Sequence, residues 1–167
     1  LVVDTNVTHE LTDSGFNDRV YECHEATAQL DAVMGKRVRS LRDVTPEELQ
    51  AYADEIDTPH FRRARHVTSE IRRVEAAAEA LGAGHLESVG SLMRESHRSL
   101  HEDYEVSCDE LDVVVDALDE QDPVLGSRMV GGGWGGSAVA LVEPDAIEEV
   151  ATVASEQYAA ETGIECD

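Results

Sequence analysis

A run of glycines broken by one tryptophan is the part of this sequence best suited to chemistry. Residues 131–136 read Gly-Gly-Gly-Trp-Gly-Gly, between two segments that predict strands. Glycine permits positive φ and close backbone approach, and phosphate-binding loops use that freedom to aim N–H groups at an anion. No Lys-Ser/Thr pair follows, so it is not a Walker loop, and the following strand argues against a dinucleotide fingerprint. The spacing alone leaves a tight hairpin and a functional loop as equal alternatives.

Arginines and histidines form the other patterns that could carry chemistry. Segment 61–81 of an acidic chain holds Arg62, Arg63, Arg65, Arg72 and Arg73. The simplest interpretation is i,i+4 ion pairs with Glu70 and Glu75, worth about 0.2–0.5 kcal/mol each. His66 with Glu70, and His97 with His101, have the spacing of metal ligands on a helix, but neither pair has a third ligand nearby in the sequence. We therefore predict no metal site.

Hydrophobic spacing and helix-start signals predict the elements that must position these residues. We expect a strand at 1–4, then a polar loop to residue 16 with a turn at Asp13-Ser14-Gly15. Thr45-Pro46 and Thr58-Pro59 are helix starts, and one apolar stripe from Ala64 to Leu81 predicts a long amphipathic helix. The expected helices cover 17–34, 46–56, 61–81, 86–101, 109–119 and 144–162, and the expected later strands cover 126–130, 137–143 and 164–166. This order is typical of an α+β fold.

The charge balance excludes several classes of partner. The chain has 36 Asp and Glu against 13 Lys and Arg, a net charge of -23, and its only lysine is Lys36. Such a surface does not bind DNA, RNA or anionic membranes. Disorder and mimicry of nucleic acid are the weaker explanations, because the acids are spread over amphipathic segments. We favour adaptation to a salt-rich cytoplasm, in which salt screens the self-repulsion (a halophilic protein).

Length and cysteine content fit one cytoplasmic domain. The 167 residues are an ordinary domain size, and no apolar stretch approaches the roughly 18–20 residues of a membrane span. Cys23, Cys108 and Cys166 are an odd, scattered set, which predicts reduced, partly buried thiols. The sequence begins within an apolar run at Leu1, which we interpret as a fragment boundary and not as a signal peptide.

Several longer stretches are distinctive: 6–19, Phe61-Arg-Arg-Ala-Arg-His66 with Glu70-Ile-Arg-Arg73, 90–112, and Gly126-Ser-Arg-Met129 with the glycine loop. These stretches resemble galactokinases, a family of the GHMP small-molecule kinase superfamily. They cover nearly the whole chain, in order and with fitting spacing. Residues 1–167 are thereby identified as a GHMP-kinase C-terminal domain, for which the resemblance implies an α+β, ferredoxin-like core with several long amphipathic helices.

The resemblance also implies an activity and which of two domains supplies the groups that carry it out. The family transfers the γ-phosphate of ATP to the anomeric hydroxyl of galactose, with Mg²⁺, in a cleft between two domains. The N-terminal domain, absent from this chain, would bind ATP, Mg²⁺ and most of the sugar and supply every catalytic residue. This chain alone should then be inactive. By resemblance, the loop of Gly131, Gly132, Gly133, Trp134, Gly135 and Gly136 faces that domain across the cleft. Substitution of Gly133 by Val is expected to crowd the cleft while the fold survives.

Departures from the family pattern bear on specificity. Phe16 stands where galactokinases usually have a sugar-contacting Tyr, Trp134 where they have Phe, Ser137 where they have Cys, and Asp109 where they have Pro. The missing Tyr hydroxyl removes a hydrogen bond worth about 1 kcal/mol. A GHMP kinase for another sugar or sugar derivative therefore stays open as an alternative. A non-catalytic relative that senses sugar and nucleotide is a separate alternative.

Overall fold

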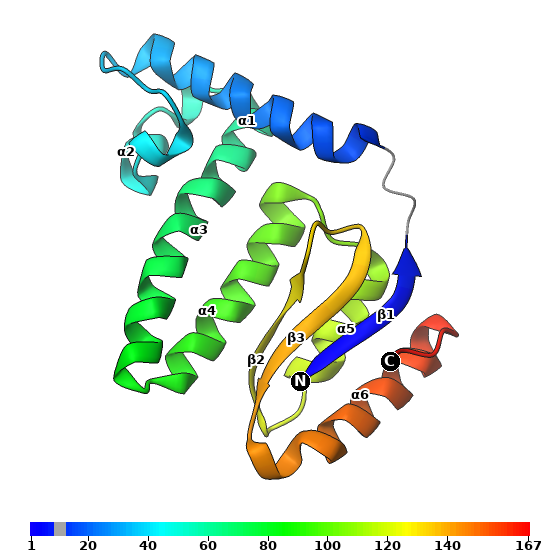
Figure 1. The fold of residues 1–167 in the computed structure, drawn as a ribbon. Coiled ribbons are helices and arrows are strands. Elements are labelled where there is room, and N and C mark those ends of the chain that lie inside the picture. Colours follow the sequence, from blue (N-terminus) through cyan, green and yellow to red (C-terminus); the bar gives the residue numbers. More distant parts are fainter. Residues whose placement is uncertain (9–12) are drawn as a thin grey trace.

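An antiparallel sheet that joins the N-terminal strand to a hairpin far along the chain is the centre of the fold (Figure 1). The computed structural model describes residues 1–8 and 13–167. Within them the sheet has the order β1-β3-β2, with β1 at Val2–Thr8, β2 at Val124–Val130 and β3 at Gly135–Val142. Val139 of the central strand pairs with Val2 on one side and with Arg128 on the other. The first strand of the chain is thereby joined to the hairpin that carries the glycine loop.

Five of the six α-helices in the described residues pack in two groups, each with a core of its own. The bounds of the six are α1 Asp13–Val33, α2 Pro46–Ala51, α3 Thr58–Ala83, α4 Leu86–Ser99, α5 Asp109–Asp119 and α6 Ile147–Thr162. Helices α5 and α6 bury Val114, Leu118 and Tyr158 against the sheet, and the Tyr158 hydroxyl donates to the carbonyl of Thr5 at 2.8 Å. Helices α1, α2 and α3 enclose a second core around Leu30 and Leu49. The α+β prediction is confirmed.

Helix α4 covers the outer edge of β2. The two backbones touch at Gly90 and Gly126, where a Cβ on Gly90 would lie 1.8 Å from the carbonyl oxygen of Leu125. Arg94 donates to the carbonyls of Leu125 and Val124 at 2.8 and 3.0 Å. Exposed strand edges invite unwanted pairing, and a helix over the edge prevents it.

Local signals predicted some boundaries well. Thr45 accepts the N–H of Glu48 in a capping box at the start of α2, as expected. The three cysteines are free and half-buried, also as expected. Among the described residues, no helix is long and apolar enough to cross a membrane.

Other expectations were wrong. Asp13-Ser14-Gly15 opens α1 and is not a turn, so the helix begins four residues before the predicted start at residue 17. Residues 164–166 form no strand, although Asp167 and Asp4 exchange two backbone hydrogen bonds of 2.7 and 3.0 Å. The stripe of α3 is covered only in its first half: Val74 is 64% exposed and Leu81 56%. The rest of the polar loop expected before residue 16 falls partly on β1 and partly outside the described residues.

Candidate functional site

The glycine loop forms the tip of the β2–β3 hairpin. Only residues 131–134 lie outside the strands, because β3 already begins at Gly135. Gly131, Gly133, Gly135 and Gly136 all have positive φ, between 87° and 123°. Trp134 also has positive φ, at 56°, which is uncommon for a residue with a side chain. A backbone of this kind explains the concentration of glycine.

The two sides of the loop differ in what they face. A Cβ built on Gly131, Gly132 or Gly136 would meet no atom within 4 Å. A Cβ on Gly133 would lie 2.2 Å from the carbonyl oxygen of Val106. That same carbonyl accepts the Trp134 N–H at 2.7 Å. One side of the loop is therefore open, and the other is fixed to the turn that precedes α5.

The loop also contacts the start of α1, which carries Phe16. The Trp134 indole lies 3.2 Å from the position of a Cβ on Gly15, and Figure 1 shows the hairpin tip beside the first turns of that helix. Phe16 itself is 61% exposed, as is Tyr21. Val20 on the same helix is 39% exposed. The structure thus brings the two sequence-predicted site elements together, beside an exposed apolar surface on α1.

The arginines of α3 do not follow the predicted i,i+4 pattern. Arg73 does pair with Glu70, three residues earlier, but the others reach distant segments. Arg65 pairs with Asp103, while Arg72 pairs with Glu47. The prediction was wrong because helical spacing says nothing about carboxylates that tertiary packing brings to the same helix face.

Arg63 is the most buried of these arginines, with only 3% of its side chain exposed. Its Nε donates to Glu22 of α1 at 2.7 Å, and Nη1 and Nη2 donate at 2.5 Å to the Asp103 carbonyl and to the Glu105 carboxylate. The hydrogen bond from Arg63 holds the pKa of Glu105 below its ordinary value. Burial alone would raise the pKa of Glu22, but Arg63 and Arg19 lower it. Both carboxylates are therefore ionised partners.

His66 is buried beside this cluster. Its ring stacks on Tyr104 with centroids 4.4 Å apart, and its Nδ1 lies 2.9 Å from the Ser99 hydroxyl. Burial lowers the pKa of His66 to about 4, although the nearby charge of Glu70 acts to raise it. The neutral imidazole is thus a packing and hydrogen-bonding group at neutral pH.

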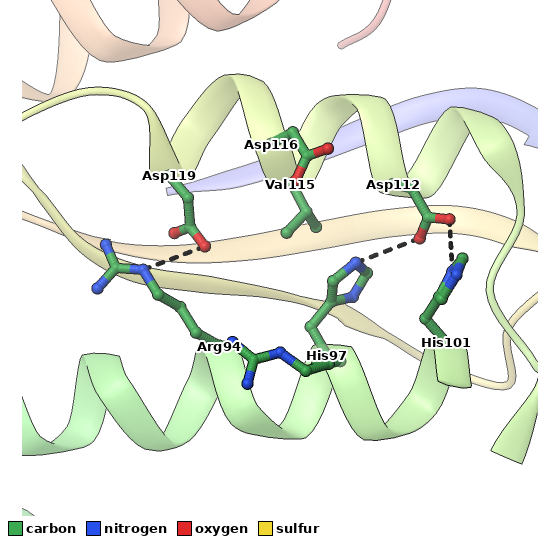
Figure 2. A pocket seen from close by; sticks show the side chains of 8 residues that line it. Arg94, His97, His101, Asp112, Val115, Asp116 and Asp119 are labelled. Carbon is green, nitrogen blue, oxygen red and sulfur yellow. Dashed lines mark ion pairs between the residues drawn. The ribbon is translucent and has the colours of Figure 1, made fainter. Parts of the chain in front are cut away.

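A polar pocket of about 440 Å³ lies between α4 and α5 (Figure 2). Basic side chains come from α4 and from His101 just after its C-terminal end, and α5 contributes carboxylates. Dashed lines in Figure 2 mark the pairs that join them. Arg94 Nε lies 3.2 Å from Asp119, and Asp112 lies 3.3 Å from His97 and 2.7 Å from His101. Most of the polar groups in this pocket therefore hold α4 against α5.

His97 on α4 and His101, two residues after that helix ends, share a partner that the sequence did not reveal. Asp112 lies on another element, eleven residues beyond His101. Nδ1 of His97 accepts the Met129 N–H at 3.3 Å, so the proton of the neutral ring sits on Nε2, which faces Asp112. Burial would raise the pKa of Asp112, but hydrogen bonds from His97 and Ser107 lower it. This is hydrogen-bonding geometry, and the described residues hold no group of three or more side chains arranged for a metal ion.

Sequence relatives cover nearly all of this chain. The family "GHMP kinases C terminal" matches residues 77–160. Galactokinases of Bos taurus and Homo sapiens are 47% and 46% identical over 158 residues, 95% of this chain and 39% of each relative. The galactokinase of Chloroflexus aurantiacus is 43% identical over 163 residues, 98% of this chain and 42% of that protein. The chain thus spans about two fifths of the length of these relatives.

Solved structures share the fold. A crystal structure of Lactococcus lactis galactokinase complexed with galactose superposes with a TM-score of 0.94 at 35% identity, over 99% of this chain and 42% of that one. L. major mevalonate kinase in complex with R-mevalonate gives a TM-score of 0.60 at 22% identity, over 98% of this chain and 39% of that one. The second likeness concerns the fold alone.

Proposed function

Since the chain belongs to the GHMP kinases, we propose that it forms the C-terminal domain of a kinase that phosphorylates the anomeric hydroxyl of galactose with ATP. The observation that carries this proposal is the 47% identity to a galactokinase over 95% of the chain. The missing partner is the protein's own N-terminal domain, and the compartment is a salt-rich cytoplasm. The chain alone is expected to be inactive, because the reacting groups belong to that domain.

The glycine loop is proposed to line the crevice between the two domains. Its open side, at Gly131, Gly132 and Gly136, leaves room for a phosphate-bearing neighbour to approach the backbone. The exposed apolar surface with Phe16 lies next to it, as a sugar-facing element should. Phosphoryl transfer depends mainly on positioning and charge stabilisation, for which a closely approaching glycine backbone is suited.

ATP and Mg²⁺ would be bound mainly outside this chain. The open side of the loop fits the approach of a nucleotide phosphate, to which backbone N–H groups could donate. For Mg²⁺ the described residues offer no cluster of three or more carboxylate, histidine or cysteine side chains. We therefore assign no residue of this chain to the metal and derive no step through it.

An assay of the longer protein tests the proposal. The protein with its N-terminal domain, in molar KCl with ATP and MgCl₂, is expected to phosphorylate galactose in preference to glucose, mannose and N-acetylgalactosamine. The 167-residue chain serves as the inactive control. Absence of phosphorylation of every sugar would favour a non-catalytic relative and would overturn the proposal.

Phe16 favours a second candidate, a GHMP kinase for a different sugar. The side chain is exposed beside the loop and lacks the hydroxyl of the usual Tyr. If galactose is the substrate, Phe16→Tyr should lower its KM about fivefold, the equivalent of one hydrogen bond of about 1 kcal/mol. Tyr21→Phe, at an equally exposed position of the same helix, is the matched control and should change nothing. A KM for galactose that rises in Phe16→Tyr, with another sugar preferred by the unmodified protein, would favour the second candidate.

A further inference from the structure

Arg63 connects the two elements that the proposed function places in the crevice. One connection runs through Glu22 to α1, the helix that carries Phe16 six residues earlier. The other runs through Asp103 and Glu105 to the turn before α5. Each guanidinium nitrogen has a different partner, which matches the rigid fork of donors that distinguishes Arg from Lys.

The turn held by Arg63 is strained, and it leads directly into the loop contact. Glu105 has φ 54°, a left-handed conformation that a non-glycine residue keeps only where the surrounding structure enforces it. The backbone N–H groups of Glu105 and Val106 close this turn by donating to the Leu100 carbonyl. Ion pairs from Arg62 and Arg63, at 2.8 and 2.5 Å, then hold the two carboxylate oxygens of Glu105 in place. The next residue, Val106, accepts the Trp134 N–H and faces Gly133.

Stability alone is a weak explanation for this arrangement. A buried arginine must recover a large desolvation cost, and apolar side chains of similar volume often stabilise a core equally well. What apolar side chains cannot do is fix the direction of a carbonyl and two carboxylates at once. The network is better explained by the geometry that it imposes on α1 and on the loop.

We propose that Arg63 is a positioning residue that sets the glycine loop relative to the Phe16 end of α1. It touches no substrate, and it acts through Glu22 on one side and through Glu105 and Val106 on the other. The proposal rests on the proposed function for its catalytic consequence. Its structural consequence, the placement of Trp134, can be tested independently of that function.

Trp134 provides the independent measurement, because it is the only tryptophan of the 167-residue chain. Arg63→Lys keeps the positive charge but cannot reach three partners at once. We expect a larger acrylamide quenching constant and a shifted emission maximum for Trp134 while far-UV circular dichroism stays unchanged. Arg72→Lys is the matched control, since it makes the same change on the same helix in an exposed pair with Glu47. Equal quenching in the two variants would overturn the proposal.

A second variant keeps the test decisive if Arg63→Lys does not fold. Glu105→Gly removes the carboxylate from the turn and relieves the positive φ, so the fold should persist. It should increase Trp134 quenching in the same direction. Unchanged quenching in Glu105→Gly would contradict the proposal that Arg63 positions Trp134 through Glu105 and Val106.

Kinetics of the longer protein test the catalytic consequence. Small misplacements far from the reacting atoms can reduce rates by about 100-fold, so Arg63→Lys should reduce kcat/KM by about 10- to 100-fold. The KM for the sugar should rise, whereas a merely destabilised protein would lose active sites at constant KM. An unchanged KM with a lower kcat would therefore reject the positioning role. If the unmodified protein phosphorylates no sugar, the proposed function fails, and the Trp134 measurement still decides whether Arg63 positions the loop.

Discussion

Gly132 and Gly133 are neighbours in the loop but carry different constraints. A side chain on Gly133 would run into the Val106 carbonyl from a backbone with φ 93°, so Gly133→Val should distort the hairpin itself. This contact argues against the sequence-based expectation that the fold survives the change. Gly132 has no positive φ and no atom within 4 Å of its Cβ position.

Gly132→Val is thus the cleaner test of the crevice. If the open side of the loop faces the other domain, the added side chain should reduce kcat/KM of the longer protein by at least about tenfold, by displacing aligned groups. The thermal midpoint should stay within about 1 °C, as for a surface substitution. Gly82→Val is the control, because its Cβ position in α3 is equally open and remote from the loop. Full activity in Gly132→Val would show that the loop is only a hairpin turn and has no role in the crevice.

His66 should give the chain a measurable dependence of stability on pH. Its folded pKa of about 4 is below the unfolded value of 6.5, so between these pH values the unfolded state binds more protons. The free energy of unfolding should therefore rise as the pH increases from 4 to 6.5. This gain should be lost when the pH falls back to 4. The contribution is on the order of 3 kcal/mol at neutral pH.

Urea unfolding of this chain between pH 4 and 7 measures that contribution. His66→Gln, which keeps a hydrogen-bonding partner for Ser99 without a titrating ring, should have a shallower slope than the unmodified chain. Glu70 and Asp103 face the same histidine and remain in both proteins, so they cancel in the comparison. The exposed His85→Gln variant serves as the control. Identical slopes for His66→Gln and the unmodified chain would contradict the depressed pKa.

At the scale of elements, the crossing of α4 over β2 depends on a pair of glycines. Gly90→Ala would place a methyl group 1.8 Å from the Leu125 carbonyl oxygen, where no rotamer change can relieve the contact. We expect a loss of unfolding free energy of about 3 kcal/mol or more, from overpacking against backbone. Gly82→Ala, in the open part of α3, should instead stabilise by about 0.5–1 kcal/mol. A Gly90→Ala protein as stable as the parent would show that α4 can move away from the strand.

Elements with local signals were predictable, and those fixed by distant contacts were not. The Thr45 capping box lies within four residues and correctly marks the start of α2. The first turn of α1, by contrast, lies against a residue more than a hundred positions later: a Cβ on Gly15 would be 3.2 Å from the Trp134 indole. Likewise, hydrophobic spacing defined the stripe of α3 but could not tell that no described element covers Val74. The site followed the same rule: residues 131–136 are visible as a motif, whereas the link through Val106 exists only in three dimensions.

At the scale of the whole molecule, the net charge of -23 sets the dependence on salt. Repulsion among 36 carboxylates opposes compaction, while the 13 cations are mostly held in pairs such as Arg63–Glu22 and Arg94–Asp119. Salt weakens both the repulsion among carboxylates and the attraction within ion pairs, since the Debye length falls from about 10 Å at 0.1 M to about 3 Å at 1 M. The balance favours stabilisation, because short, partly buried pairs are screened much less than distant exposed charges.

The thermal midpoint of this chain should therefore rise as KCl increases from 0.1 to 1 M. For a domain of this size each kcal/mol corresponds to about 2–4 °C, so a gain of several degrees is measurable. A variant with Glu75, Glu79 and Glu87 changed to Gln removes three exposed charges from the α3–α4 hairpin. It should melt higher than the parent at 0.1 M and converge with it at 1 M. If the parent melts lower in 1 M KCl than in 0.1 M, attraction within the ion pairs outweighs the repulsion, and the acidic surface is no adaptation to salt.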